Sequence, residues 1–292
     1  MTSETGECEC EGEGEGEADE TRDGNEAEFK EVIEYVEDDL NFVTSYFEKN
    51  HLKRRLASRI RRKDVDEENY GRYLELLRRN EDEQEKLLDT LSINVTEFFR
   101  NHEVWEGIRE VLRELSDEKP LVNVWSVPCS DGREPYSVAM LARDDPEIDA
   151  SKFKIKATDI DSKILEEARE GVYRKTRSVN VESQLEFLDD YSDYIHDDGR
   201  NLVVNEGIKS MVDFEKHDII SGEPKSGFDL VICRNLFIYI ESMYKPSVVR
   251  NIQNSMNRYG YLVIGKTETL PREVSDDFEA MDSSLRIYRK VR

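Results

Sequence analysis

The segment from Val124 to Ser137 constrains the fold more than any other part of the sequence. A short apolar run ends in a turn of small and polar residues, and Pro135 then stands where a helix would begin, a position at which its missing N–H costs nothing. A second apolar run, Phe153–Thr158, follows and ends at Asp159. Such a strand–turn–helix–strand unit is typical of nucleoside binding, with the carboxylate placed to accept hydrogen bonds from ribose hydroxyls.

The carboxylates after the second run have another interpretation. Asp159 and Asp161 precede a predicted helix, Ser162–Glu170, and either side chain is suited to cap it. The sequence has no G-x-G-x-x-G motif and no Walker lysine. A dinucleotide site and a nucleoside triphosphate site are therefore not supported.

Short apolar runs that alternate with helical periodicity predict an α/β fold with a mainly parallel sheet. A last run, Ser284–Arg289, is expected to add an antiparallel strand at the sheet edge. Between Gly171 and Val212 the alternation is interrupted, which predicts a small inserted subdomain containing β-structure. The buried strands are predicted at Leu121–Val127, Phe153–Thr158, Phe228–Cys233 and Tyr259–Gly265.

The rest of the chain divides by composition and periodicity. Glu-Gly alternation near the start cannot bury enough surface to offset ordering entropy, and helical periodicity begins at Phe29. The predicted organisation is a disordered acidic tail at 1–28, a helical domain at 29–101, a linker helix at 102–120, and an α/β domain at 121–292 that contains the insertion at 171–212.

Charge and cysteine content exclude several functions. The net charge is −24, and the first 28 residues contribute twelve acidic side chains and one arginine to it. This balance disfavours nucleic-acid binding and fits a high-salt cytoplasm. The four cysteines form no Cys-x-x-Cys and the four histidines are scattered, so no metal site is expected. With no signal peptide and no apolar run long enough to span a bilayer, we expect a cytoplasmic protein without membrane insertion.

Five segments of the chain are informative when their order and spacing are considered together. In their order and spacing they resemble the CheR family of chemotaxis receptor methyltransferases, which transfer a methyl group from S-adenosylmethionine (SAM) to chemoreceptor glutamates. The resemblance covers roughly residues 28–292. It implies a Rossmann-like SAM-dependent methyltransferase sheet, a small all-α N-terminal domain, and S-adenosylhomocysteine as product. The segments are Leu91–Asn101, Ser126–Ser137, Ala157–Asp161, Phe228–Tyr239 and Gly260–Glu268.

The resemblance also implies site residues. Arg100 and Tyr239 match the pair nearest the transferred methyl group, so they are the predicted catalytic residues. The chain departs from the family pattern at Pro128 and Arg133 in the turn, and it has Gly265-Lys266-Thr267-Glu268 where relatives have Gly-His-Ser-Glu. Asp218 stands where relatives usually have Asn. The predicted SAM contacts are Asn94, Thr96, Arg100, Glu134, Asp159, Asp218, Ile219, Arg234 and Asn235.

Methyl transfer to a carboxylate suits this residue set. A glutamate nucleophile, with an ordinary pKa of about 4.3, is already ionised near neutral pH, so no strong general base is required. A guanidinium such as that of Arg100 has a planar fork that can orient a carboxylate. Outside the family context, Arg100 reads as a surface ion-pair residue, and Tyr239 as a core residue whose hydroxyl reaches a backbone partner. A catalytically inactive SAM-binding scaffold or sensor is the alternative function.

A basic helix lies in the otherwise acidic chain. Residues 51–63 contain seven Lys or Arg, and Leu52, Leu56 and Ile60 share one helical face. We expect Lys53–Lys63 to dock on the acidic cytoplasmic helices of a chemoreceptor, with a merely solvated helix face as the alternative. Nothing in the sequence requires more than a monomer. The arginines expected on the opposite side are Arg54, Arg55, Arg59, Arg61 and Arg62.

Overall fold

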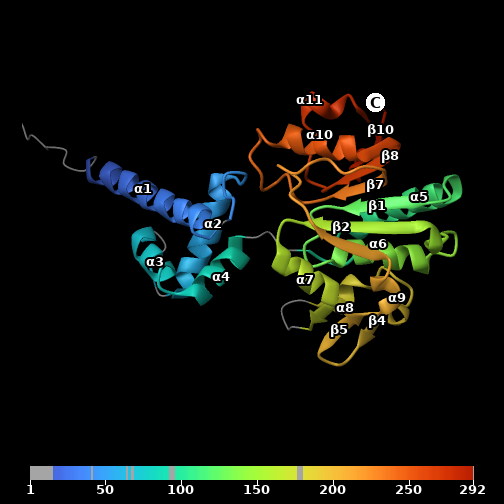
Figure 1. Cartoon of the computed structure of the whole chain (residues 1–292), viewed down its shortest axis with the longest axis horizontal. Helices are drawn as coiled ribbons and strands as arrows, with labels where there is room; N and C mark the ends of the chain where they lie inside the picture. Colours follow the sequence, from blue (N-terminus) through green and yellow to red (C-terminus); the bar gives the residue numbers. More distant parts are fainter. Residues whose placement is uncertain are drawn as a thin grey trace, which may run out of the picture. The chain divides into compact units, whose positions relative to one another are not determined.

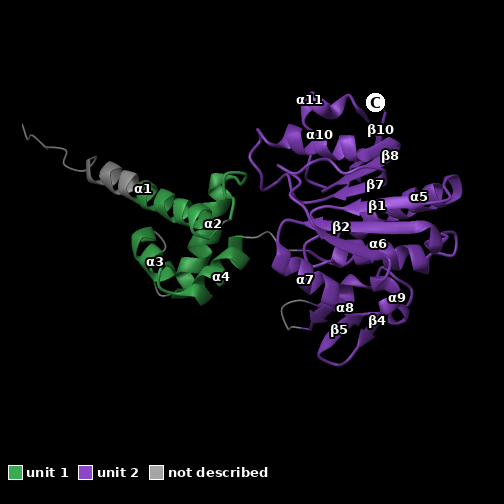
Figure 2. Cartoon of the chain, in the orientation of Figure 1, with its two compact units in different colours: residues 1–91 green, residues 92–292 purple. Residues whose placement is uncertain are grey.

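The computed structural model describes residues 16–40, 42–63, 65–66, 69–91, 96–175 and 180–291. The chain forms two compact units, residues 1–91 and 92–292 (Figure 2). This boundary lies ten residues before the one predicted at 101. Phe98 and Phe99 explain the difference, because both are buried in the hydrophobic core of the second unit. Their backbone N–H groups also donate to Gln184 and Ser137 of that unit.

The first unit is helical, with a core formed by one face of each helix. Leu52, Leu56 and Ile60 are buried, as their spacing predicted. No helix in the described part of the chain is both long and apolar enough to cross a bilayer. The elements of the unit are α1 (Gly16–Asp38), α2 (Lys49–Ile60), the 3₁₀ helix η1 (Arg61–Lys63), α3 (Tyr70–Leu77) and α4 (Glu81–Leu91) (Figure 1).

Helix α1 begins within the segment predicted to be a disordered tail. Two of the acidic residues there have partners in the helical unit. Glu26 forms ion pairs with Lys49 and Lys53 of α2, and Glu28 accepts a hydrogen bond from the backbone N–H of Gly71 at 2.9 Å. The composition argument missed these contacts because they depend on residues far along the chain.

Arg59 differs from its prediction as an exposed basic residue. Its guanidinium is buried and donates twice to the Glu83 carboxylate, at 2.7 and 2.6 Å. Lys63 lies 2.6 Å from the same carboxylate, and the Tyr73 hydroxyl donates to it at 2.9 Å. A buried carboxylate needs such partners, so Arg59 and Lys63 hold the unit together internally.

The second unit contains a seven-stranded sheet in the order β6-β2-β1-β7-β8-β10-β9. The first five are parallel, and the last two are antiparallel to their neighbours. The strands are β1 (Val122–Ser126), β2 (Phe153–Asp159), β6 (Val212–Lys216), β7 (Phe228–Cys233), β8 (Met256–Ile264), β9 (Phe278–Asp282) and β10 (Ile287–Lys290).

The four buried strands and the last antiparallel strand were predicted, but the two edges were not. Strand β10 lies inside the sheet, because β9 pairs with its outer side. The edge strands β6 and β9 each bury only one residue fully, Phe214 and Phe278 respectively. An edge strand of this kind has no continuous apolar run, so hydrophobic periodicity alone did not reveal it.

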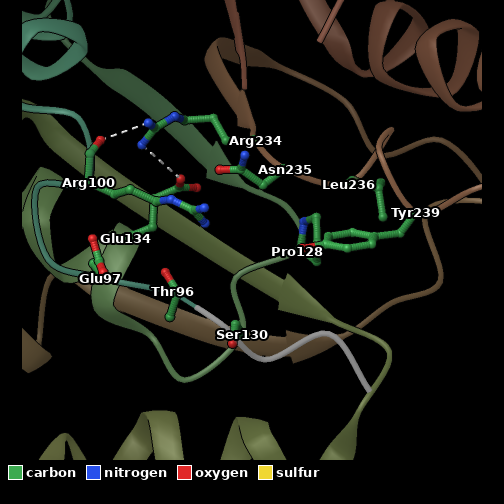
Figure 3. Close-up of a pocket in the computed structure, with 10 residues that line it drawn as sticks. All are labelled: Thr96, Glu97, Arg100, Pro128, Ser130, Glu134, Arg234, Asn235, Leu236 and Tyr239. Atoms are coloured by element: carbon green, nitrogen blue, oxygen red, sulfur yellow. Dashed lines mark hydrogen bonds and ion pairs between the residues drawn. The ribbon is translucent and has the colours of Figure 1, made fainter. Parts of the chain in front are cut away.

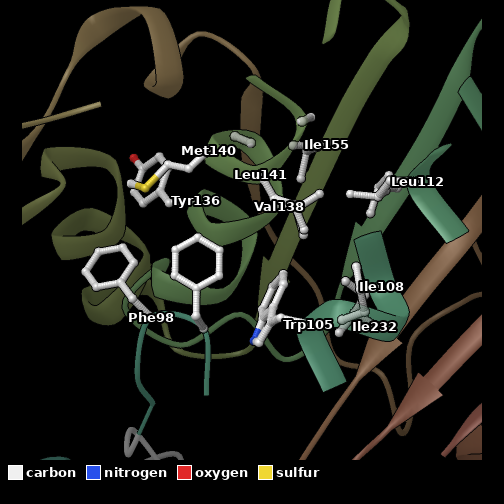
Figure 4. Packing of buried hydrophobic residues seen from close by; sticks show 14 of the residues in the cluster. Phe98, Trp105, Ile108, Leu112, Tyr136, Val138, Met140, Leu141, Ile155 and Ile232 are labelled. Atoms are coloured by element: carbon white, nitrogen blue, oxygen red, sulfur yellow. The ribbon is translucent and has the colours of Figure 1, made fainter. Parts of the chain in front are cut away.

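Helices cover both faces of the sheet. Trp105, Ile108 and Leu112 of α5 (His102–Glu118) pack with residues of α6 (Arg133–Asp144) on one face (Figure 4). Helix α5 is thus a core helix of the second unit and not a linker. Val248 and Ile252 belong to the cluster on the other face. Outside the insertion, the other helices described in this unit are α7 (Ser162–Glu170), α10 (Lys245–Ser255), α11 (Arg272–Ser275) and the 3₁₀ helix η2 (Ala150–Lys152).

The insertion predicted at 171–212 forms a small antiparallel sheet in the order β3-β5-β4. Its apolar side chains, including Tyr173 and Leu202, join the core of the α/β unit. The subdomain is therefore packed on the main sheet. Its elements are β3 (Val172–Arg174), α8 (Val181–Gln184), η3 (Tyr191–Asp193), β4 (Ile195–Asp197), β5 (Asn201–Val204) and α9 (Glu206–Lys209).

The strand order fixes where a ligand can bind. From β1 the chain passes to β2 on one side, and it returns later to β7 on the other side. The crevice outside the carboxyl ends of strands at such a switch point is the binding region of open α/β sheets. The turn after β1 and the loop after β7 both begin there.

Candidate functional site

A pocket lies at this switch point (Figure 3). It encloses about 520 Å³ of empty space, open solvent included. Three segments form it: the residues before α5, the turn after β1 with the start of α6, and the loop after β7. The lining residues are Thr96, Glu97, Arg100, Pro128, Ser130, Glu134, Arg234, Asn235, Leu236 and Tyr239.

Asp159 supports the turn after β1 from the end of β2. Its carboxylate accepts hydrogen bonds from the backbone N–H groups of Ser130, at 2.9 Å, and Asp161, at 3.1 Å. Burial raises the pKa of Asp159 to about 6, although these bonds oppose the rise. Asp161 is the residue that caps α7, accepting from Lys163 and Ile164. The two carboxylates thus differ: Asp161 is a helix cap, and Asp159 fixes the turn one contact away from the pocket.

Glu134 contributes a buried carboxylate from the first turn of α6. It accepts a hydrogen bond from the Ser126 hydroxyl at 2.8 Å, and its other oxygen lies 3.7 Å from Nη1 of Arg234. Burial raises the pKa of Glu134 to about 7, while Arg234, Ser126 and Arg100 pull it down. A neighbouring cation supplied by a ligand would complete the neutralisation of this carboxylate.

Arg234 connects two of the three segments. Its Nη2 donates to the carbonyl oxygen of Arg100 at 2.7 Å and to the Asn101 side chain at 3.0 Å. Its side chain is 2% exposed, and burial lowers its pKa. In Figure 3, Arg100 approaches the pocket from the segment before α5 and Tyr239 from the loop after β7. Residues more than a hundred positions apart therefore share one site.

Arg133, a departure from the family pattern, also supports the pocket. Its Nη1 donates to the carbonyl oxygen of Thr96 at 2.8 Å, and its guanidinium lies 4.9 Å from the centre of the Tyr173 ring. It also lies 3.5 Å from Asp131. Arg133 thus ties the segment before α5 to the start of α6. The other departure, Pro128, lines the pocket itself, and the peptide bond before it is cis.

Four residues that line the pocket or flank a lining residue have a positive φ although they are not glycine. They are Phe99 (46°), Asn101 (62°), Ser130 (49°) and Asn235 (61°). Ser130 and Asn235 line the pocket, and Phe99 and Asn101 flank the pocket residue Arg100. The backbone in all three pocket segments is therefore left-handed at one position or more.

The structure brings six predicted site residues together: Thr96, Arg100, Glu134, Arg234, Asn235 and Tyr239. Asn94 lies outside the described residues. Asp218 and Ile219 are not among the pocket residues. Ile219 packs in the apolar cluster around Trp125, and Asp218 bonds locally to Ile220 and Ser221. Their place as SAM contacts remains a prediction. Four further residues line the pocket without having been predicted as SAM contacts: Glu97, Pro128, Ser130 and Leu236. All four stand within the motif segments, and Pro128 was noted there as a departure from the family pattern.

The donors and acceptors of the pocket fit the amino-acid end of SAM. The hydroxyl of Ser130 and Nε of Arg234 are buried and have no hydrogen-bond partner among the described residues. With the Glu134 carboxylate, the pocket offers an acceptor for an ammonium group and donors for a carboxylate. A zwitterionic amino-acid group has this pair of charges.

Comparison with known families agrees with the fold and the pocket, which together define a SAM-dependent methyltransferase. Residues 94–287 match the CheR methyltransferase SAM binding domain, and residues 27–92 match the CheR methyltransferase all-alpha domain. The chain therefore belongs to the CheR methyltransferase family.

Curated relatives align along most of the chain. A chemotaxis protein methyltransferase of Borreliella burgdorferi is 30% identical over 257 residues, covering 83% of this chain and 88% of the relative. That of Listeria monocytogenes is 28% identical, with 80% and 87% covered. That of Escherichia coli is 28% identical, with 84% and 85% covered. The similarity thus extends over both units.

Proposed function

We propose that this protein transfers the methyl group of SAM to glutamate side chains in the cytoplasmic domains of chemoreceptors, forming glutamate γ-methyl esters in chemotactic adaptation. The names of the curated relatives support the chemoreceptor as substrate. The observation that carries the proposal is the convergence of Arg100, Glu134, Arg234 and Tyr239 on one pocket at the sheet's switch point. Such a receptor substrate implies action in the cytoplasm.

The roles of the residues follow from their charges. When bound, SAM supplies an electrophilic methyl group, which a carboxylate oxygen takes as the carbon–sulfur bond breaks and its electron pair stays on sulfur. Glu134 would accept the ammonium group of the cofactor, and Ser130 and Arg234 would donate to its carboxylate. Arg100 would orient the substrate carboxylate with its planar fork, and the hydroxyl of Tyr239 would help to position the reacting groups.

Positioning is sufficient for this reaction. A glutamate substrate is ionised near neutral pH, so no residue has to remove a proton. Holding two reactants in line can lower a barrier by roughly 7–11 kcal/mol. Among the described pocket residues the titratable side chains are Glu97, Arg100, Glu134, Arg234 and Tyr239, a set suited to binding and orientation.

We further propose that the exposed arginines of the basic helix contact the receptor. Arg54, Arg61 and Arg62 are exposed, and Arg55 is partly exposed. Three basic groups nearby are engaged by carboxylates within the unit: Lys53 pairs with Glu26, and Arg59 and Lys63 pair with Glu83. The docking surface is therefore smaller than the sequence suggested, and it consists of arginine, whose guanidinium binds carboxylates in a bidentate manner.

The catalytic proposal is tested by incubating the full chain with methyl-labelled SAM and a cognate receptor cytoplasmic fragment. Label that base releases as methanol identifies a methyl ester. Tight SAM binding without label transfer would favour the alternative, an inactive SAM-binding scaffold or sensor. Label that resists base would instead indicate a different acceptor group.

The docking proposal is tested by reversing charge on the surface of the helix. The double variant Arg54→Glu/Arg62→Glu should raise KM for the receptor fragment roughly tenfold and leave SAM affinity unchanged. The matched control is Arg72→Glu/Arg79→Glu, which reverses two exposed arginines elsewhere in the same unit. Equal effects of the two double variants would reject this surface as the receptor contact.

A further inference from the structure

Glu268 is a buried carboxylate with no role in the proposed chemistry so far. It follows β8 and is 3% exposed. Its Oε2 accepts hydrogen bonds from the backbone N–H of Gly265, at 2.6 Å, and of Asn235, at 2.9 Å. Its Oε1 accepts from the N–H of Phe237 at 2.6 Å. All three donors are backbone groups, so the carboxylate fixes main chain and not a neighbouring side chain.

Two of these donors lie in the loop after β7. Asn235 lines the pocket, and Phe237 lies in sequence between two further lining residues, Leu236 and Tyr239. Within the loop, the Tyr239 N–H donates to the carbonyl oxygen of Leu236 at 3.1 Å. The path of the loop, and hence the direction of the Tyr239 side chain, depends on the two N–H groups that Glu268 holds.

The glycine at 265 provides separate evidence for the same arrangement. A Cβ atom at this position would lie 2.4 Å from Oε2 of Glu268 and 2.9 Å from the backbone nitrogen of Asn235. Heavy atoms do not approach so closely without displacement, and the Asn235 atom belongs to backbone. Glycine at this position therefore allows the end of β8 to lie against the loop, with the Glu268 carboxylate between them.

We propose that Glu268, together with Gly265, is a positioning residue for methyl transfer that sets the loop carrying Arg234, Asn235 and Tyr239. The effect of this role on kcat rests on the methyl-transfer function proposed above. An ionised carboxylate accepts hydrogen bonds only, which matches the backbone N–H donors around Glu268. A glutamine of the same shape would turn an NH₂ group toward at least one of those donors, so shape alone cannot replace the charge.

The test compares two variants with a matched control in the full chain. Glu268→Gln should lower kcat by about 10- to 100-fold, the loss expected from a displacement of about 1 Å in reacting groups, while KM for the receptor fragment stays within about twofold. Gly265→Ala should give the same pattern, because its methyl group displaces the same carboxylate. Glu273→Gln, an exposed carboxylate on α11, should behave like the parent.

A second measurement does not depend on turnover. Amide hydrogen exchange of Asn235 and Phe237 should be faster in Glu268→Gln than in the parent, with the rest of the sheet unchanged. A merely space-filling side chain predicts the opposite result: Glu268→Gln would keep parental kcat and protection, and only Glu268→Ala would lose them. That outcome overturns the inference.

The two measurements separate this inference from the proposed function. If the parent protein binds SAM but methylates no receptor fragment, the proposed function fails. Faster exchange in Glu268→Gln would then still support the positioning of the loop. If the parent methylates receptor and Glu268→Gln does so equally well with unchanged exchange, the function stands and the role of Glu268 is refuted.

Discussion

Glu134 should make the protein less stable as the pH rises, and this effect can be measured. Burial raises the pKa of Glu134 from its ordinary 4.5 to about 7. The folded state therefore holds this proton more tightly than the unfolded chain, so the contribution of Glu134 to stability is fully present below pH 4.5 and is lost as pH rises through 7. Each pKa unit is worth about 1.36 kcal/mol, so the ionised carboxylate costs the folded protein about 3 kcal/mol.

Glu134→Gln removes this cost because a neutral amide resembles the protonated acid. The difference in free energy of unfolding between the variant and the parent should grow by about 3 kcal/mol from pH 4.5 to pH 8, in favour of the variant. Both tryptophans, Trp105 and Trp125, are buried in the second unit. Urea unfolding followed by tryptophan fluorescence therefore reports on the unit that contains the pocket.

The exposed pocket residue Glu97 provides the control. Glu97→Gln should keep the pH dependence of the parent, since this side chain is exposed. Saturating SAM should stabilise the parent, by about 2.7 kcal/mol at a hundred times Kd, and should stabilise Glu134→Gln much less. A pH profile of Glu134→Gln that runs parallel to that of the parent would refute the argument from burial.

Three further predictions concern other residues. Arg100→Ala and Tyr239→Phe should lower methyl transfer by tenfold or more and SAM affinity much less; equal losses in both assays would reduce them to binding residues. Arg133→Gln removes the hydrogen bond to Thr96 and should destabilise the second unit by about 1–3 kcal/mol, measured by tryptophan fluorescence; an unchanged midpoint would contradict this role. Glu83→Gln leaves the buried Arg59 guanidinium without its counter-charge and should cost the first unit about 3–5 kcal/mol, visible as an early helical transition in circular dichroism that tryptophan fluorescence does not report.

The parts of the fold with a strong local signal could be predicted. Strands β1, β2, β7 and β8 are mainly apolar and buried along most of their length, and the helical faces of the first unit follow a 3.6-residue period. The edge strand β9 has no such run and depends on β10 as a partner. Helix α1 was taken for a tail because its contacts, such as that of Glu26 with α2, lie outside its own sequence.

The same distinction applies to the site. Arg100, Glu134 and Tyr239 could be named because they stand in motifs of recognisable spacing. The sequence could not show that Asp159 supports the turn after β1 while Asp161 caps α7, since both carboxylates lie at the end of the same strand. In the sequence, Glu268 is only the last residue of a divergent motif. Its contacts with backbone N–H groups show that it lies between the end of β8 and the loop after β7. Contacts between segments far apart in sequence decided these cases.

The residues with positive φ in the pocket segments restrict which substitutions can stabilise the protein without changing the pocket. Most residues with a side chain pay on the order of 1–2 kcal/mol for this conformation, asparagine tolerates it better than most, and glycine adopts it freely. Asn101 and Asn235 have φ values of 62° and 61°, so glycine at either position would relieve local strain. The same exchange at Asn101 removes the acceptor of Arg234, and at either position it frees the backbone of a pocket segment. Substitutions selected for thermal stability alone would therefore loosen the backbone of the pocket segments. A more stable variant that keeps its pocket has to gain its stability elsewhere in the fold.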